Sequence, residues 1–122
     1  MADVADLQSR LARVQLLLLD VDGVLTDGGD DKFAAAAEVI AGCGLSWEQT
    51  AFLGDDLPDL PVVSRCGVGA AVADACAELR RAAAVVTTLP GGRGAVRELI
   101  ERMLAARGAW EAEVARHASQ RI

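Results

Sequence analysis

Four consecutive leucines, Leu16–Leu19, stand directly before the acidic sequence Asp20-Val21-Asp22-Gly23. A short run that is wholly apolar is typical of a strand buried on both faces of a parallel sheet, so we predict a strand over 15–20. The run is far shorter than the roughly 20 apolar residues that cross a bilayer, and we expect no membrane partner. A loop rich in Gly and Asp follows over 21–31, which places several carboxylates at one end of the predicted strand.

Strand and helix patterns alternate along the rest of the chain. Short apolar runs predict further strands, and apolar positions at helical spacing predict helices. We expect strands over 50–54, 67–72 and 84–87, and helices over 32–43, 57–65, 75–83 and 94–118, the last a long one, with a single helical turn over 46–49. Such alternation implies a parallel sheet. The predicted fold class is therefore α/β, a three-layer sandwich with a short parallel sheet of about four strands, in one domain over 1–122.

The acidic residues are concentrated in two places. Eight of the eleven aspartates lie within residues 20–31 and 55–59, and the net charge of the chain is −6. This charge and the few aromatic residues argue against a nucleic-acid partner. Ligands of open parallel sheets bind beyond the carboxyl ends of the strands, and each acidic stretch follows such an end. If the first two strands are neighbours, both stretches converge on one site, which Lys32, the only lysine, can also reach.

Crowded carboxylates indicate a bound cation. A pair 4 Å apart repels by about 4 kcal/mol at an effective dielectric constant near 20, unless a proton or a cation intervenes. Oxygen ligands without His or Cys favour Mg²⁺ or Ca²⁺ over zinc, and no Glu stands where a calcium-binding loop would need one. Mg²⁺ usually completes its shell with phosphate oxygens and water. A carboxylate nucleophile, Mg²⁺ and a lysine together indicate phosphoryl transfer through an aspartyl-phosphate.

The cysteines and the N-terminus bear on location. Cys43, Cys66 and Cys76 are odd in number and show no C-x-x-C spacing, so neither a disulfide framework nor a zinc site is indicated. The N-terminus is acidic, whereas that of a signal peptide is basic. A reducing, cytoplasmic location is expected.

Four motifs resemble those of the haloacid dehalogenase-like phosphatases, in the same order as in that family. Residues 19–28 resemble the first motif and 54–59 the fourth, in the form found in the 3-deoxy-D-manno-octulosonate-8-phosphate phosphatases, a capless branch that serves lipopolysaccharide synthesis. Asp31-Lys32-Phe33 is similar to the third motif of that branch, and residues 91–98 to its C-terminal signature. The resemblance implies Mg²⁺-dependent hydrolysis of a small phosphorylated sugar acid by a homo-oligomer, a tetramer in that branch.

The resemblance also implies catalytic roles. Asp20 is the expected nucleophile and a direct ligand of Mg²⁺. Asp22 is the expected general acid and base, and its backbone carbonyl is expected on the metal. Lys32 is expected to stabilise the transferring phosphoryl group and to hold Asp20 in place. Asp31, beside it, is more typical of a helix N-cap than of a ligand.

The metal and substrate contacts are carried over in the same way. Asp55 is the expected third protein ligand of Mg²⁺, with Asp56 or Asp59 in the outer shell. Arg93 is a candidate for substrate binding, because the corresponding segment of the family approaches the site of a neighbouring subunit. A flexible turn and helix cap is an equally good interpretation of the glycines around Arg93.

The chain departs from the family in lacking the second motif. In the family, several dozen residues before the lysine form a substrate-contacting hairpin, two strands, and a Thr or Ser that hydrogen-bonds the phosphate; here Gly28-Gly29-Asp30 joins the motifs almost directly. The loss of one such donor can cost roughly 10²–10³ in rate, and Thr26 is the candidate replacement. The strand over 15–20 would become an apolar edge that tends to pair with another chain. We take the chain for a naturally or artificially shortened family member.

Two other functions stay open. The first is a catalytically weakened or inactive module that serves oligomerisation, whose assembly would not depend on Asp20 or Asp55. A precedent is the phosphatase-like C-terminal domain of some acylneuraminate cytidylyltransferases, which the sequence also resembles. A receiver domain also uses aspartates, Mg²⁺ and a lysine, but its lysine should follow both acidic strands, whereas Lys32 lies between them.

Overall fold

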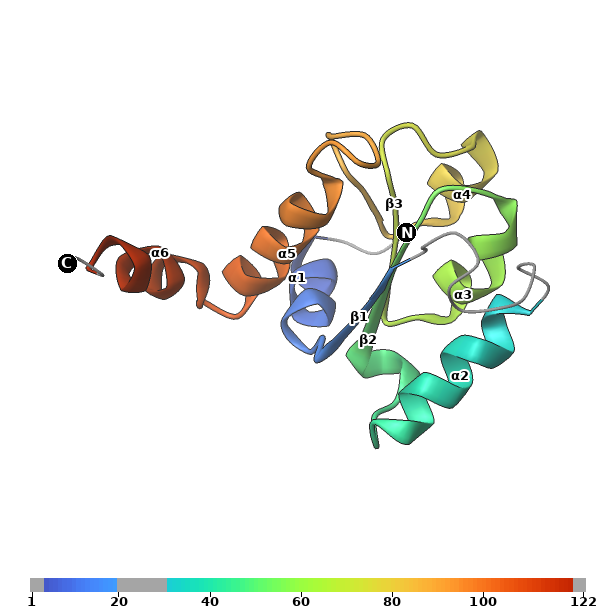
Figure 1. Cartoon of the computed structure of the whole chain (residues 1–122), viewed down its shortest axis with the longest axis horizontal. Coiled ribbons are helices and arrows are strands. Elements are labelled where there is room, and N and C mark those ends of the chain that lie inside the picture. The colour runs from blue at the N-terminus through green and yellow to red at the C-terminus, as the bar shows by residue number, and fades with distance from the viewer. Residues whose placement is uncertain (1–3, 20–30, 120–122) are drawn as a thin grey trace.

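The described part of the chain forms one sheet of four parallel strands. Figure 1 shows the computed structural model of the chain, which describes residues 4–19 and 31–119. The strands lie in the order β1-β2-β3-β4, so that strands consecutive in the sequence are hydrogen-bonded neighbours. Their bounds are β1 Leu16–Leu19, β2 Thr50–Gly54, β3 Val68–Ala71 and β4 Val85–Val86. All four strands were expected; β2 has the predicted bounds, and the other three are shorter than predicted by one residue at each end.

Helices cover both faces of this sheet (Figure 1). On one face α1 packs against α5, and on the other α3 lies between α2 and α4. The helices are α1 Val4–Ala12, α2 Lys32–Gly42, α3 Leu60–Arg65, α4 Ala77–Ala82 and α5 Ala95–Ala106, with short 3-10 helices η1 Trp47–Gln49 and η2 Leu57–Asp59. The predicted three-layer α/β sandwich is confirmed.

The helices depart from the predictions at both ends of the chain. Helix α1 was not predicted. The single long helix expected over 94–118 is two helices, α5 and α6 (Trp110–Ala118). Gly108 between them has a φ of +72°, the left-handed conformation that commonly ends a helix. Helix α6 extends away from the sheet (Figure 1) and has no buried residue, so the apolar face that predicted one helix is not a continuous packing surface.

The core lies around the two inner strands. Every residue of β2 and β3 is buried, and the helices contribute Leu11, Ile40, Val62, Leu79 and Leu99. Burying one such side chain fully contributes roughly 1.5–3 kcal/mol. None of the described helices is long and apolar enough to span a membrane.

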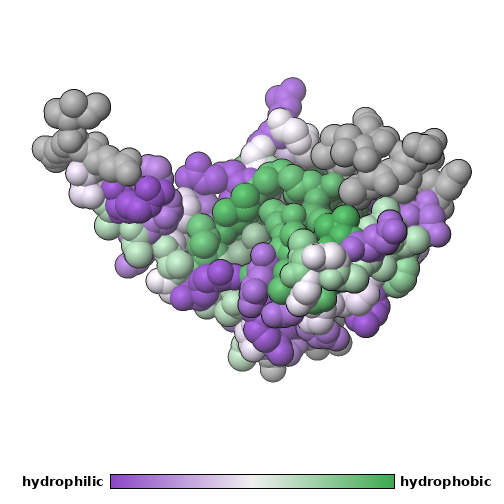
Figure 2. Space-filling view, turned by 60° about the horizontal axis from the view of Figure 1, so that its bottom comes forward, coloured by the Kyte–Doolittle hydropathy of each residue, from purple (hydrophilic) through white to green (hydrophobic). Residues whose placement is uncertain are grey.

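Strand β1 forms one end of the sheet and is less well covered. Leu18 is buried, but Leu16, Leu17 and Leu19 are only partly so. Figure 2, which brings the lower side of Figure 1 forward, shows a broad hydrophobic area on this face of the molecule. The apolar run that predicted a fully buried strand therefore lies at a sheet edge.

Candidate active site

The carboxyl ends of the strands meet along one edge of the sheet. In the parallel register Leu19 lies opposite Leu53, and Gly54 lies opposite Ala71. The first two strands are thus neighbours, which was the condition for the two acidic stretches to converge, and Asp55 follows β2 at the edge where β1 ends. Asp20, Asp22 and Thr26, three of the residues predicted for the site, lie outside the described residues.

Asp59 joins two of the predicted motifs. Its side chain has no exposed surface. Its Oδ1 accepts a hydrogen bond from Lys32 Nζ at 2.8 Å, and its Oδ2 accepts from the backbone N of Asp55 at 2.9 Å and of Asp56 at 3.2 Å. A buried carboxylate is tolerated only when it is paired and hydrogen-bonded in this way. The lysine of one motif and the backbone that presents Asp55 are therefore fixed relative to each other.

The local sequence explains why Lys32 reaches this position. Asp31 is the N-cap of α2, and its Oδ1 accepts from the backbone N of Ala34 at 2.9 Å. The expected capping role of Asp31 is confirmed. Lys32 is the first residue of α2, and its side chain is 14% exposed. The cap sets where the helix begins, and thereby where the ammonium enters the site.

Glycine is required at position 54 for a steric reason. A Cβ placed there would lie 2.7 Å from both Cβ and Oδ2 of Asp59, far inside normal contact distance. The end of β2 can therefore approach the buried carboxylate only with glycine at that position. The Gly-Asp-Asp spacing of the motif has a direct packing explanation.

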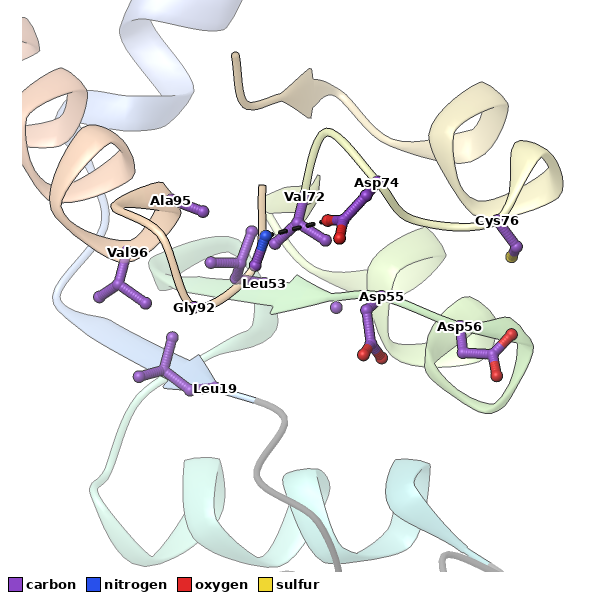
Figure 3. A pocket seen from close by; sticks show the side chains of 12 residues that line it. Leu19, Leu53, Asp55, Asp56, Val72, Asp74, Cys76, Gly92, Ala95 and Val96 are labelled. Atoms are coloured by element: carbon purple, nitrogen blue, oxygen red, sulfur yellow. Dashed lines mark hydrogen bonds between the residues drawn. The ribbon is translucent and has the colours of Figure 1, made fainter. Parts of the chain in front are cut away.

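A pocket of about 790 Å³ opens at this edge of the sheet (Figure 3). Apolar side chains lie on one side of it and carboxylates on the other, with a glycine turn at its rim; the residues are Leu19, Leu53, Val72, Ala95 and Val96, then Asp55, Asp56 and Asp74, then Gly91 and Gly92. Asp55 and Asp56 are exposed. Oδ1 of Asp56 accepts from the backbone N of Leu57 at 2.8 Å, as the cap of η2.

Arg93, a predicted substrate-binding residue, lies on the turn between Pro90 and α5. Its backbone N donates to the carbonyl O of Pro90 at 3.1 Å, and the residue is exposed. Arg93 does not line the pocket that the described residues form. Its predicted role is neither supported nor contradicted by this position.

Two carboxylates that were not predicted as site residues hold the turn that carries Gly91, and one of them, Asp74, lines the pocket. Oδ1 of Asp74 accepts from the backbone N of Gly91 at 2.9 Å, and the carboxylate of Glu98 accepts from Thr88 and Leu89. Asp74 follows β3 at the same sheet edge as Asp55, so the rule on strand ends could have selected it. Glu98 gives no such signal, because its partners are nine and ten residues away on a turn.

The described residues test the metal site only in part. Residues 4–19 and 31–119 contain no group of three or more His, Cys, Asp or Glu placed to hold a metal ion. The predicted ligand set also draws on Asp20 and Asp22, which lie outside these ranges. The carboxylate oxygens of Asp55 and Asp56 at the pocket are hard donors, which suit Mg²⁺.

Comparison with known proteins decides the family. The family model for haloacid dehalogenase-like hydrolases matches residues 19–99. The chain belongs to this family. It is 41% identical to the 3-deoxy-D-manno-octulosonate 8-phosphate phosphatase of Yersinia pestis over 106 residues, 85% of this chain and 57% of that protein. The chain spans about half the length of the curated relatives it matches.

Two solved structures share the fold of this haloacid dehalogenase-like chain. The phosphatase of the same name from Yersinia pestis superposes with a TM-score of 0.78 at 30% identity, covering 87% of this chain and 89% of that one. The one from Moraxella catarrhalis, in complex with magnesium, phosphate and its sugar acid, gives a TM-score of 0.84 at 24% identity, covering 94% and 99%. At 24% identity, the second likeness concerns the fold alone.

Proposed function

We propose that the chain hydrolyses phosphomonoesters with Mg²⁺ through an aspartyl-phosphate, most like the 3-deoxy-D-manno-octulosonate 8-phosphate phosphatases. The observation that carries the proposal is the buried Lys32–Asp59 pair, which ties the lysine to the backbone of Asp55 beside a pocket at the end of β1. A purely structural ion pair would not need an adjoining pocket with exposed carboxylates. Family membership adds independent support.

In the proposed reaction the chain supplies nucleophile, proton and positive charge. A carboxylate oxygen of Asp20 attacks phosphorus while the bond from phosphorus to the leaving oxygen breaks, and Asp22 gives that oxygen a proton. Water then attacks the phosphorus of the aspartyl-phosphate, Asp22 takes its proton, and phosphate and free Asp20 result. A lysine ammonium has three donors, so the bond from Lys32 to Asp59 is compatible with a second one to a phosphoryl oxygen.

The carboxylates fit the proposed Mg²⁺. Asp20, Asp55 and the backbone carbonyl of Asp22 would hold it, with Asp56 in the outer shell. When bound, it would neutralise charge on the phosphoryl oxygens. In this arrangement Asp59 does not act as a ligand but positions the groups around the metal, because both of its oxygens accept from the chain itself.

The finer parts of the proposal concern substrate, location and assembly. The activity of the related phosphatases suggests a phosphorylated sugar acid as substrate, and the three free cysteines suggest a cytoplasmic location. Thr26 and Arg93 are the proposed additional substrate contacts. A homo-oligomer, a tetramer by resemblance, is proposed because β1 is an apolar strand at one end of the sheet.

The test is phosphate release with and without Mg²⁺. Octulosonate 8-phosphate and p-nitrophenyl phosphate are offered to the wild type, to Asp20→Asn and to Asp31→Asn. We expect Mg²⁺-dependent release from the wild type, none above background from Asp20→Asn, and unchanged rates for Asp31→Asn, because Asn caps a helix as well as Asp does. Release that persists in Asp20→Asn would contradict the mechanism.

A second candidate function is a phosphatase-like module that serves oligomerisation. The observation that favours it is the β1 edge, where three of the four leucines are only partly buried and no charged or proline residue interrupts them. Folded protein without turnover, but with stable assembly, would favour this function over the first.

A further inference from the structure

Residues 87–92, here called the wall loop, lead from β4 toward α5 and bring Gly91 and Gly92 to the pocket. Figure 3 shows Gly92 near Val96, on the side of the pocket opposite Asp55. The width of the pocket between the wall loop and Asp55 and Asp56, which follow β2, therefore depends on how firmly this loop is held. Four residues of the loop are fixed by groups from elsewhere in the chain or by each other.

Glu98 holds the first half of the wall loop. From the first turn of α5, its Oε2 accepts from the backbone N of Thr88 at 2.8 Å, and its Oε1 accepts from the hydroxyl of Thr88 and from the backbone N of Leu89, each at 3.0 Å. Partial desolvation disfavours the charged form, but these hydrogen bonds outweigh it and hold the pKa of Glu98 below its usual value. The negative charge also suits the N-terminus of a helix.

Asp74 holds the second half. Its Oδ1 accepts from the backbone N of Gly91 at 2.9 Å, as the dashed line in Figure 3 shows. The adjoining backbone N of Ala73 donates to Thr87 Oγ1 at 3.2 Å, and the hydroxyl of Thr87 donates to the carbonyl O of Leu89 at 2.6 Å. The segment after β3 is thereby tied to the wall loop at two points, of which the Asp74 contact lies at the pocket itself.

From these contacts we propose that Asp74 and Glu98 are positioning residues. They hold the wall loop so that the pocket accepts a bulky leaving group at a fixed position relative to Asp55. The inference rests on the proposed phosphatase function. Neither carboxylate takes part in bond making. Their effect is to fix the backbone of Gly91 and Gly92, which have no side chains and cannot fix themselves through packing.

The experiment has one arm that is independent of activity. Amide hydrogen exchange is followed over residues 88–94 in the wild type, Asp74→Ala, Asp74→Asn, Glu98→Ala and Glu78→Ala. Glu78 is the matched control, a carboxylate on α4 that pairs with Arg81 at 3.8 Å. We expect exchange to rise at least about tenfold in Asp74→Ala and Glu98→Ala, because each removes hydrogen bonds that close the loop. Asn at position 74 keeps an oxygen acceptor and should restore much of the protection.

The second arm measures selectivity as the ratio of kcat/KM for octulosonate 8-phosphate to that for p-nitrophenyl phosphate. The larger leaving group, that of octulosonate 8-phosphate, should reach the wall loop. We therefore expect this ratio to fall about tenfold in Asp74→Ala, which corresponds to the loss of about one hydrogen bond. The change should appear in KM more than in kcat. Asp74→Asn should recover part of the ratio, and Glu78→Ala should keep it.

The two arms separate the failure of this inference from that of the proposed function. A wild type without Mg²⁺-dependent turnover overturns the function, and with it the substrate part of this inference. An active wild type whose selectivity ratio or loop exchange is unchanged by Asp74→Ala overturns the positioning role alone.

Discussion

At the scale of single residues, Asp59 accepts three hydrogen bonds on a side chain that has no exposed surface. The donors are Lys32 Nζ and the backbone N of Asp55 and Asp56. An ionised carboxylate can accept all of them because it offers about four lone-pair positions on two oxygens. The geometry of the acidic loop therefore depends on one charge that makes no direct contact with the pocket.

Asp59→Asn should destabilise the fold markedly. The amide keeps one acceptor oxygen and turns an NH₂ group toward donors, leaving buried donors unsatisfied and Lys32 without its charge partner. We expect a loss of about 2–4 kcal/mol in the free energy of unfolding, measured by urea denaturation. Asp31→Asn, the same chemical change at a helix cap, should alter stability by less than about 0.5 kcal/mol. Similar stabilities for both variants would show that the pair is dispensable.

The cysteines should differ sharply in reactivity. Burial raises the pKa of the Cys66 thiol to about 12, against a weaker opposing effect of Arg65, and its side chain is 5% exposed. At pH 8 it stays a neutral thiol, whereas the thiolate is the form that reacts. In the folded protein we expect iodoacetamide to modify the exposed Cys43 and to leave Cys66 unmodified, as read by mass spectrometry; in urea both should react. Equal labelling of both in the native state would contradict the burial of Cys66.

At the scale of elements, the predicted ends of α2, α3 and α4 lie within one residue of the observed ones, whereas the break between α5 and α6 was missed. Asp31 before Lys32 is a capping signal that depends on neighbouring residues only. The end of α5 depends on Gly108 adopting a left-handed conformation, and an apolar stripe continuing to Trp110 does not reveal it. Helix α1 was not predicted, although Leu7 and Leu11 stand at helical spacing and pack on the core; its contact with α5 joins the two ends of the chain.

The contact between α5 and the wall loop should weaken in acid. Partial desolvation disfavours the charged form of Glu98, but hydrogen bonds from Thr88 and Leu89 outweigh it and lower the pKa of Glu98 from its ordinary value of 4.5. The ionised Glu98 therefore contributes to stability above pH 4.5, and this contribution is lost as the pH falls through the lower pKa of the folded state. The stability difference between wild type and Glu98→Gln should therefore be largest above about pH 5 and shrink below pH 4.5. Denaturation curves from pH 3 to 7 measure it, with Glu78→Gln as control. A difference that grows toward acid pH has the wrong sign for this account.

At the scale of the whole molecule, β1 is an edge strand of the sheet that the described residues form. Sheet edges in natural proteins are usually protected by charges, proline, bulges or a covering element. Strand β1 consists of four leucines, three of them only partly buried. A hydrophobic area of this kind is typical of an interaction surface (Figure 2).

Assembly through β1 should be sensitive to charge at the edge and insensitive to the acidic loop. By light scattering after size exclusion we expect a mass above 12.7 kDa for the wild type and for Asp55→Asn. Leu17→Lys should shift the equilibrium to the monomer, because a charge at the edge opposes pairing. A circular dichroism spectrum shows whether that variant is folded. A wild type that stays monomeric at about 100 µM would falsify the proposed assembly.

The local patterns of the sequence were sufficient for the class of fold and for the approximate bounds of its four strands. Strands, caps and acidic turns depend on residues close in the chain, and parallel strands necessarily bring their carboxyl ends to one edge. Only the tertiary structure decided that Lys32 pairs with Asp59, that Gly54 is required by that carboxylate, and that Asp74 and Glu98 hold the wall loop. These contacts join residues that are 5 to 27 positions apart in the sequence. Their partners are set by how helices and loops pack on the sheet, which no local pattern records.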